Sequence, residues 1–283
     1  MKDKYGRDID HLRISVTQMC NLSCTYCHHE GEYNPGQEQS PVEIKRFVEV
    51  FTELGIRKIK ITGGEPLIRE DILEIIRSIS SIKNIEEISM TTNGTLLEGL
   101  AVDLKRVGLS RINIGCDSLT SILPKNTETV GKGLTAAHNA GLNPIKINMV
   151  VLKGINDGDI ERMIGFAREN QVVLQLIELI NVDSDFYRRH YFSLENVEKS
   201  LERRAYHVRK RKMQARRQYH LDDVIVEIVK PSKNGFCLNC LKIRLTSDGR
   251  LKPCLMKKDN LIVSKDKDSI LKAFEERCIY AHD

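Results

Sequence analysis

Three cysteines near the amino terminus have a spacing that suits an iron-sulfur cluster. Cys20, Cys24 and Cys27 form a C-x3-C-x2-C pattern. Three thiolates can hold three irons of a cubic cluster and leave the fourth iron open, as in a reactive metal site. A zinc loop that lacks a ligand and a set of buried thiols are the alternatives, but His28 and His29 follow too closely to complete a relaxed tetrahedron. The pattern therefore predicts a [4Fe-4S] cluster with one open iron.

A second group of cysteines lies near the carboxyl terminus. Cys237, Cys240 and Cys254 form a C-x2-C-x13-C pattern, again with three thiolates and no obvious fourth ligand. A zinc ribbon would require a second complete pair, for which Cys278 is only a distant candidate. We instead expect Cys278, like Cys116, to be a small buried side chain. The second group thus indicates another [4Fe-4S] cluster with an open iron.

Two short polar motifs follow segments that we expect to be strands. In Gly63-Gly64-Glu65-Pro66 the glycines permit close approach of the main chain to a ligand, although a plain strand-to-helix turn would also explain them. In Thr91-Thr92-Asn93-Gly94 the Asn-Gly pair ordinarily means a tight turn. Its position at a strand end makes the Thr91 hydroxyl a candidate ligand.

Hydrophobic periodicity predicts strands alternating with helices over the first 180 residues. Strands are expected at 11–17, 57–62, 87–92, 111–115, 144–152 and 172–180, and helices at 41–54, 71–82, 96–107, 128–140 and 159–170. This alternation implies parallel strands joined by right-handed crossovers. A closed eightfold barrel needs roughly 250 residues, so six units predict an α/β fold with a partial (βα)6 TIM-like barrel. Its chemistry would lie at the carboxyl ends of the strands.

The alternation stops after residue 180. Only strands at 224–229 and 241–248 and a helix at 269–277 are expected beyond it. We therefore divide the chain into a partial barrel, 1–180, and a C-terminal domain, 181–283, which carries the second cluster and closes the barrel. Within the second part, Arg203 to Arg217 holds eight Lys or Arg residues and no acid. This run is either a solvated face or a clamp for an anion.

Composition sets the remaining bounds. A chain of 283 residues with 41% hydrophobic residues can form a sizeable core, and its net charge of +5 is mild. No apolar run approaches the roughly 20 residues that a membrane helix needs. The first residues carry no secretion signal, and cysteines gathered in two tight groups suit a reducing compartment. We expect a cytoplasmic protein without membrane association.

The cysteine loop, with Tyr26 before its last cysteine, and the Gly63 to Pro66 motif resemble the radical S-adenosylmethionine (SAM) superfamily. The segment from Phe236 to Met256 is similar to the GTP 3',8-cyclase family of molybdenum cofactor biosynthesis, and the similarity runs from about Tyr5 to Asn260. The segment 174–179 and the basic residues that follow look like the archaeal branch. This resemblance implies that SAM binds the open iron of the first cluster and is split to a 5'-deoxyadenosyl radical. The radical would take the 3'-hydrogen of GTP and yield 3',8-cyclo-7,8-dihydro-GTP.

The resemblance also implies two sets of ligands. The contacts to SAM would be Tyr26, Gly64, Gly115 and Ile180, and those to GTP would be Arg13, Lys60, Thr91, Lys146, Lys242 and Arg244. A triphosphate needs several fixed cations, which the second set supplies. The chain departs from the family pattern where Gly115 replaces a serine, where Ile180 replaces a methionine, and where Lys60, Lys242 and Gln175 replace arginines. Many relatives end in a Gly-Gly tail, whereas this chain ends in Cys278-Ile-Tyr-Ala-His-Asp.

The resemblance further implies GTP as substrate, a ferredoxin or flavodoxin as electron donor, and cyclic pyranopterin monophosphate synthase as the enzyme that receives the product. It leaves a homodimer open. Two rival interpretations stay in view. A radical SAM enzyme of the twitch-domain class that modifies a peptide would also carry an extra cluster, but would not require the basic set around Lys60, Lys242 and Arg244. A non-catalytic metal-binding module that grips nucleic acid would use Arg203 to Arg217.

Overall fold

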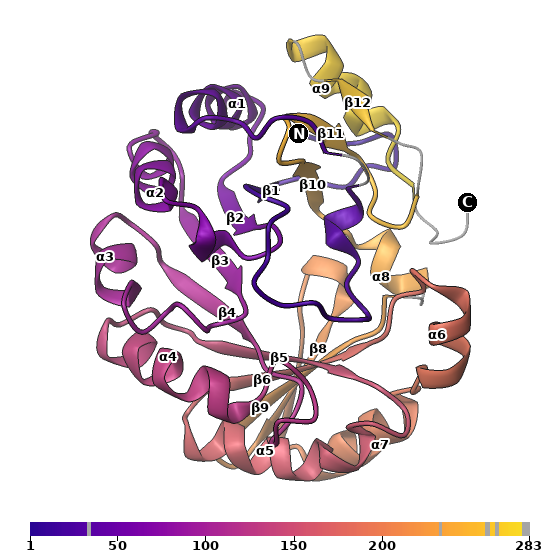
Figure 1. The fold of residues 1–283 in the computed structure, drawn as a ribbon. Helices are drawn as coiled ribbons and strands as arrows, with labels where there is room; N and C mark the ends of the chain where they lie inside the picture. Colours follow the sequence, from indigo (N-terminus) through magenta and orange to yellow (C-terminus); the bar gives the residue numbers. More distant parts are fainter. Residues whose placement is uncertain (33–34, 232–233, 258–260, 264–265, 279–283) are drawn as a thin grey trace.

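The barrel half of the chain is a curved parallel sheet with helices on its outer side (Figure 1). The computed structural model describes residues 1–32, 35–231, 234–257, 261–263 and 266–278. The six strands are β1 His11–Ser15, β2 Lys58–Thr62, β3 Glu87–Thr92, β4 Arg111–Gly115, β5 Lys146–Val151 and β6 Val173–Glu178. The helices between them are α1 Pro41–Glu53, α2 Ile72–Ser80, α3 Ala101–Arg106, α4 Thr127–Asn139 and α5 Ile160–Glu169. The predicted partial α/β barrel is confirmed.

Local sequence explains most boundaries of these elements. The Ser40 side chain and Glu43 form a capping box at the start of α1, and Gly55, at a φ of 95°, follows its end. Helix α3 begins at Ala101, five residues later than the periodicity predicts. The preceding residues instead make turns, with Leu97 N–H bonded to the Gly94 carbonyl, and Gly99 in this segment disfavours helix.

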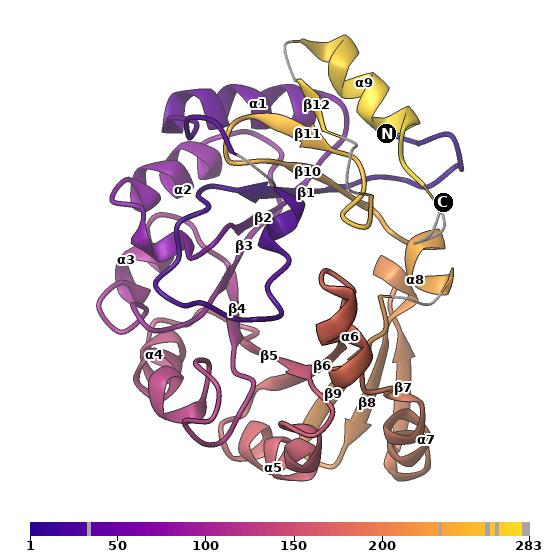
Figure 2. The same cartoon turned by 45° about the vertical axis from the view of Figure 1, so that its right-hand side comes forward.

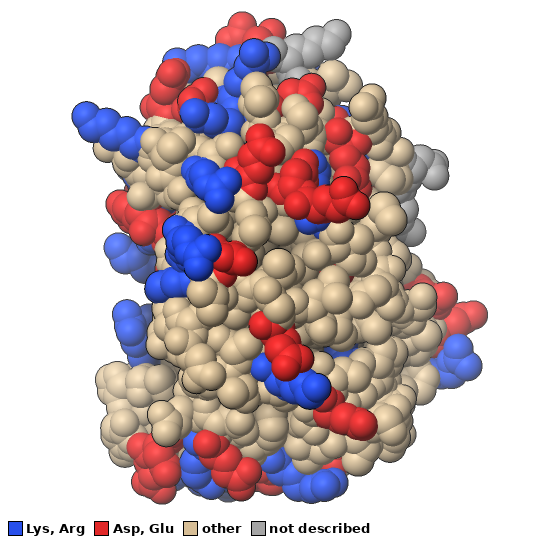
Figure 3. Space-filling view, turned by 60° about the vertical axis from the view of Figure 1, so that its left-hand side comes forward, with Lys and Arg blue, Asp and Glu red and all other residues tan. Residues whose placement is uncertain are grey.

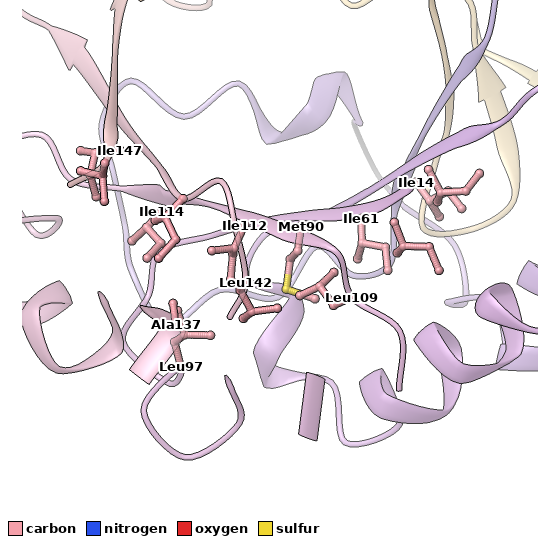
Figure 4. Close-up of a cluster of buried hydrophobic side chains, with 14 of the residues drawn as sticks. Ile14, Ile61, Met90, Leu97, Leu109, Ile112, Ile114, Ala137, Leu142 and Ile147 are labelled. Carbon is pink, nitrogen blue, oxygen red and sulfur yellow. The ribbon is translucent and has the colours of Figure 1, made fainter. Parts of the chain in front are cut away.

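The hydrophobic core lies between the sheet and the outer helices. Strand residues Ile14, Ile61, Met90, Ile112, Ile114 and Ile147 meet Leu97, Leu109, Ala137 and Leu142 there (Figure 4). Because successive side chains of a strand point to opposite faces, Ile59 and Ile61 face the helices and Lys60 faces the concave side. The concave side is therefore available for polar chemistry.

The residues after β6 add strands to both edges of this sheet (Figures 1 and 2). They form α6 Ser184–His190, α7 Glu195–Arg204, β7 His207–Lys210, β8 Arg217–Leu221, β9 Val224–Val229, α8 Asn234–Leu238, β10 Lys242–Leu245, β11 Arg250–Lys252, β12 Ile262–Val263 and α9 Lys267–Glu275. Strand β9 pairs in parallel with β6, and β10 pairs in parallel with β1. The sequence does not predict α6, α7, β7, β8, α8, β11 or β12, because these elements are short or rich in polar residues.

Among the residues that the structure describes, short 3-10 helices occupy four connections, namely η1 His29–Gly31, η2 Pro66–Ile68, η3 Asp157–Asp159 and η4 Met213–Ala215. In the described part of the chain, no helix combines the length and the apolar character needed to cross a bilayer. Lys and Arg residues are interspersed with Asp and Glu on the face shown in Figure 3, which is the side that carries the barrel helices. The cavity inside the barrel is instead lined by more Lys and Arg residues than Asp and Glu residues.

Candidate active site

A cavity of about 680 Å³ opens at the carboxyl ends of the barrel strands. Seven of the eight cysteines line it, and Cys116 is the one that does not. All sixteen residues that the sequence suggests as ligands line it too: Arg13, Cys20, Cys24, Tyr26, Cys27, Lys60, Gly64, Thr91, Gly115, Lys146, Ile180, Cys237, Cys240, Lys242, Arg244 and Cys254. Positions more than 200 residues apart in sequence thus share one site, whose volume suits small molecules.

The N-terminal trio, Cys20, Cys24 and Cys27, lies in the loop that follows β1. Cys20 is exposed, and the other two are half-buried. Burial raises the pKa of the Cys24 thiol, and the neighbouring Cys20 raises it further. Burial also raises the pKa of Cys27, and Cys24 contributes in the same direction. The thiols of Cys20, Cys24 and Cys27 are therefore close enough for their charges to interact.

Glycine at positions 63 and 64 lets this loop cross the end of β2. A Cβ atom on Gly64 would lie 2.2 Å from the Met19 carbonyl oxygen, and one on Gly63, whose φ is 154°, would lie 2.4 Å from the Thr17 oxygen. The Glu65 carboxylate accepts hydrogen bonds from the Thr92 hydroxyl and the Asn93 N–H, both at 2.6 Å. The two polar motifs of the sequence thus hold each other and the cysteine loop in place.

Lys125, which the sequence analysis does not single out, lies beside the N-terminal trio. Burial opposes its charge, but Asp117 and the three cysteines raise the pKa of Lys125. Its ammonium group lies 3.2 Å from the Tyr26 hydroxyl, which also donates a hydrogen bond to Asp117. A Cβ atom on Gly115 would lie 2.8 Å from the Lys125 stem. Glycine at position 115 therefore makes room for the Lys125 side chain.

A row of cations crosses the adjacent strands on the concave side. Arg13 of β1 is in register with Arg244 of β10 on one side and with Lys60 of β2 on the other. Lys242 lies two residues before Arg244 on the same face. Burial lowers the pKa values of Lys60 and Lys242 well below the ordinary lysine value, and neighbouring Arg and Lys residues lower them further. Such crowding of like charge is suited to a bound polyanion.

Glu30 lies among these cations, although no sequence motif contains it. Its carboxylate accepts a hydrogen bond from Arg13 at 2.5 Å and one from the Thr62 hydroxyl at 3.0 Å, and lies 4.0 Å from Arg244. Although burial favours the neutral acid, Arg13, His28 and Arg244 lower the pKa of Glu30 to about 2. The acid thus stays charged, and its hydrogen bond to Arg13 orients that arginine.

A second buried carboxylate organises the opposite side of the cavity. Glu227 accepts a hydrogen bond from Lys146 at 2.7 Å and lies 2.8 Å from Arg216 and 3.4 Å from Arg211. Gln175 donates to the same carboxylate at 2.7 Å. Both arginines line the cavity, whereas the β7 part of the basic run is exposed. The run therefore combines a solvated strand with two cations that face the site.

The C-terminal trio, Cys237, Cys240 and Cys254, is brought together by α8 and the turn after β11. Burial raises the pKa of Cys237 to about 11, and Cys254 and Cys240 contribute. Burial also opposes ionisation of Cys240, but Arg277, Lys242 and Arg244 together lower its pKa. This trio therefore lies at the positive end of the cavity.

Comparison with known proteins identifies the family. Residues 14–167 match the Radical SAM superfamily, and residues 172–273 match Molybdenum Cofactor Synthesis C. The chain is 42% identical to a "Probable GTP 3',8-cyclase" of Methanothermobacter thermautotrophicus, with 94% of this chain and 90% of that protein covered. It belongs to the GTP 3',8-cyclase family of radical SAM enzymes. A relative with the same name from Pyrococcus horikoshii is 43% identical, with 92% and 88% covered. The resemblance to archaeal cyclases is confirmed.

Solved structures agree on the fold. SuiB of Streptococcus suis bound to S-adenosylmethionine superposes on the cyclase-family chain with a TM-score of 0.70 at 15% identity, over 97% of this chain and 67% of that one. SuiB bound to its precursor peptide SuiA gives a TM-score of 0.71 at 15% identity, over 97% of this chain and 66%, slightly under two thirds, of SuiB. At such low identity the likeness shows the radical SAM barrel alone.

The donor set fits the two [4Fe-4S] clusters and SAM that the cyclase family uses. Backbone N–H groups of Leu22 and His29 lie 3.4 Å and 3.5 Å from the sulfurs of Cys20 and Cys27, and N–H groups also face Cys240 and Cys254. Such contacts stabilise thiolates and are typical of cluster ligands. Among the described residues, no three Cys, His, Asp or Glu side chains converge on a single ion. A cube spreads its thiolates over different irons, so its ligands lie further apart.

Proposed function

We propose that the protein converts GTP to 3',8-cyclo-7,8-dihydro-GTP in the first step of molybdenum cofactor biosynthesis. The observation that carries this proposal is one cavity lined by two cysteine trios and by a crowd of buried cations. The cysteines suit two [4Fe-4S] clusters, and the cations suit a triphosphate. The family and the names of its curated relatives support the same reaction.

The proposed ligand residues follow the cavity. For SAM these are Tyr26, Gly64, Gly115 and Ile180, for GTP they are Arg13, Lys60, Thr91, Lys146, Lys242 and Arg244, and for the clusters they are Cys20, Cys24, Cys27, Cys237, Cys240 and Cys254. Bound SAM and its cluster would supply the radical chemistry. The chain contributes binding and orientation. A bound polyanion would raise the lowered pKa values of Lys60 and Lys242 again. Relief of the repulsion among these buried cations would therefore favour binding of the substrate.

Two carboxylates would position the cations before GTP arrives. Glu30 holds Arg13 at 2.5 Å, and Glu227 holds Lys146 at 2.7 Å. Preorganised charges need no rearrangement when the substrate binds, so side chains fixed in this way would hold a triphosphate in one orientation. At the N-terminal trio, the charged groups that act on the Lys125 ammonium are Asp117 and the cysteines, not other cations. Lys125 would attract a single carboxylate, such as that of SAM.

The remaining assignments belong to the same proposal. Residues 1–180 would form the radical-generating domain, and 181–283 would carry the second cluster. A ferredoxin or flavodoxin would deliver electrons to the N-terminal cluster, whose ligand Cys20 is exposed. Cyclic pyranopterin monophosphate synthase would receive the product. The thiols would require a reducing compartment such as the cytoplasm. The homodimer is the assembly that the family resemblance leaves open.

Anaerobic reconstitution with iron and sulfide tests the function. The reconstituted protein is incubated with GTP, SAM and dithionite, and the products are separated, identified and quantified by mass spectrometry. We expect 5'-deoxyadenosine and the cyclised dihydro-nucleotide to appear in equal amounts. A peptide-modifying enzyme would instead cleave SAM while GTP neither binds nor stabilises the protein, and that result would refute the proposal.

A further inference from the structure

The C-terminal tail places a fourth cysteine beside the second trio. Cys278 is buried, with 8% of its surface exposed, and lines the same cavity as Cys237, Cys240 and Cys254. Its thiol donates a hydrogen bond to the Cys254 sulfur. Cys237 also acts electrostatically on Cys278. The tail cysteine therefore lies near two of the three sulfurs, not merely in the apolar core.

Two arginines hold the main chain of the tail against the main chain of the trio. The Arg7 guanidinium donates to the Cys237 carbonyl at 2.6 Å and to the Cys278 carbonyl at 3.2 Å through the same nitrogen. The Arg277 guanidinium donates to the Cys240 carbonyl. Arg7 thus links the main chain of Cys237 to that of Cys278, and Arg277 links the tail to the main chain of Cys240.

A single carboxylate orients both arginines. Asp3 accepts from Arg7 at 2.7 Å and from Arg277 at 3.0 Å, and all three side chains are at most 8% exposed. Burying three charged groups costs free energy, which the hydrogen bonds among them and to the main chain offset. The clamp formed by Asp3, Arg7 and Arg277 holds the main chain at Cys278 beside the main chain of Cys237 and Cys240, which limits where the Cys278 side chain can go.

We propose that Cys278 supplies a fourth thiolate to the C-terminal [4Fe-4S] cluster and closes that cluster before substrate binds. A ligand that enters must then replace it: the bond from iron to the Cys278 sulfur breaks and a bond from iron to a ligand nitrogen or oxygen forms. The cluster keeps its electrons, and the released thiolate takes up one proton from solvent. That the entering ligand is GTP rests on the function proposed above.

Spectroscopy of the C-terminal cluster tests this proposal without any turnover. In full-length protein with Cys20, Cys24 and Cys27 replaced by alanine, ⁵⁷Fe reconstitution and removal of added thiols leave one cluster to observe. Mössbauer spectra of this protein should show four irons with the same all-thiolate environment. A distinct iron with nitrogen or oxygen ligation in this protein, which retains Cys278, would overturn the proposal whatever any variant does.

Mild ferricyanide oxidation gives the matched comparison. In the same background, Cys278→Ala should yield at least roughly tenfold more of the three-iron EPR signal, because an open iron is lost more readily than a closed one. Cys116→Ala, which removes a buried cysteine outside the cavity lining, should leave that signal as it is. Equal signals from Cys278→Ala and its parent would contradict a fourth ligand.

Binding of GTP separates this inference from the proposed function. Cys278→Ala should bind GTP about tenfold more tightly than its parent, because no ligand has to leave first. Equal affinity would refute the exchange of Cys278 for GTP. If neither protein binds GTP, the proposed function fails, while the Mössbauer and EPR spectra still decide whether Cys278 is a ligand.

Discussion

The two cysteine trios line one cavity but differ in the charges around them. The N-terminal trio lies in one loop and has Lys125 as its nearby cation, partnered by Asp117. The C-terminal trio is assembled from α8 and the turn after β11, and Arg7, Arg277, Lys242 and Arg244 influence its thiols. Two groups of three cysteines with different charged residues around them suit different small molecules. A zwitterion fits the first site, and a polyanion fits the second.

The largest effect expected from this difference is the loss of SAM cleavage in Cys24→Ala. Removing a ligand of the N-terminal cluster should lower formation of 5'-deoxyadenosine by at least roughly a thousandfold. The C-terminal cluster should still assemble, so the iron content should fall by about half. Product assays and iron counts on the reconstituted variant check both statements. Normal SAM cleavage by this variant would place the radical source elsewhere.

Cys237→Ala should show the opposite pattern. This variant should lose cyclisation of GTP by roughly a hundredfold or more but keep slow SAM cleavage, because the radical source is intact while the substrate is not positioned. The ratio of 5'-deoxyadenosine to cyclised product, measured in one reaction mixture, reports the uncoupling. If the ratio stayed near one, the trios would not have separate tasks.

Arg244→Ala should weaken the binding of GTP more than the binding of SAM. Loss of one charge-assisted contact costs about 1.5–3 kcal/mol, which corresponds to a rise of about 10–100-fold in KM for GTP. The KM for SAM should change little. Arg106→Ala is the matched control, because Arg106 is an exposed arginine of α3 that pairs with Asp103. An equal rise of both KM values for Arg244→Ala would indicate general damage to the cavity.

A smaller effect is expected from pH through Lys146. Burial lowers the pKa of Lys146 to about 8, and Arg211 and Arg216 lower it against the pull of Glu227. In the free enzyme the ammonium thus loses its proton above about pH 8, and kcat/KM for GTP should fall about tenfold by one pH unit higher. In Lys146→Met, kcat/KM for GTP should be lower than in the parent protein below about pH 8, and it should not fall further between about pH 8 and 9.

Unfolding would not explain such a fall. Between about pH 8 and the ordinary lysine pKa, the unfolded chain binds more protons at Lys146 than the folded chain does. The contribution of this residue to the free energy of unfolding therefore rises with pH in that window. Thermal melts recorded beside the kinetics at each pH distinguish a loss of charge from a loss of fold.

The sequence predicted those elements whose bounds depend on the residues within them and next to them. The bounds of β3, β4 and β9 agree with the sequence, because runs of apolar and β-branched residues and polar turns define them. Cysteine spacing indicated both trios in the same way. Polar elements such as β7, whose four residues are all exposed, leave no such signal.

The sequence could not show contacts between distant segments. Lys125 reaches the N-terminal trio from the loop before α4, and Glu30 meets Arg244 across more than 200 residues. The only hint of Glu30 was an acid three residues after Cys27. Tertiary packing brings up the charged residues beside each trio, whereas the spacing of the cysteines in the sequence is enough to propose them as ligands.

The fate of the ribose 3'-hydrogen tests the central claim most directly. GTP that carries deuterium at C3' is incubated with the anaerobically reconstituted enzyme, SAM and reductant, and the 5'-deoxyadenosine is weighed by mass spectrometry. We predict that each 5'-deoxyadenosine formed with GTP gains one deuterium and that the cyclised product has lost it. Unlabelled 5'-deoxyadenosine together with unchanged GTP would contradict the account.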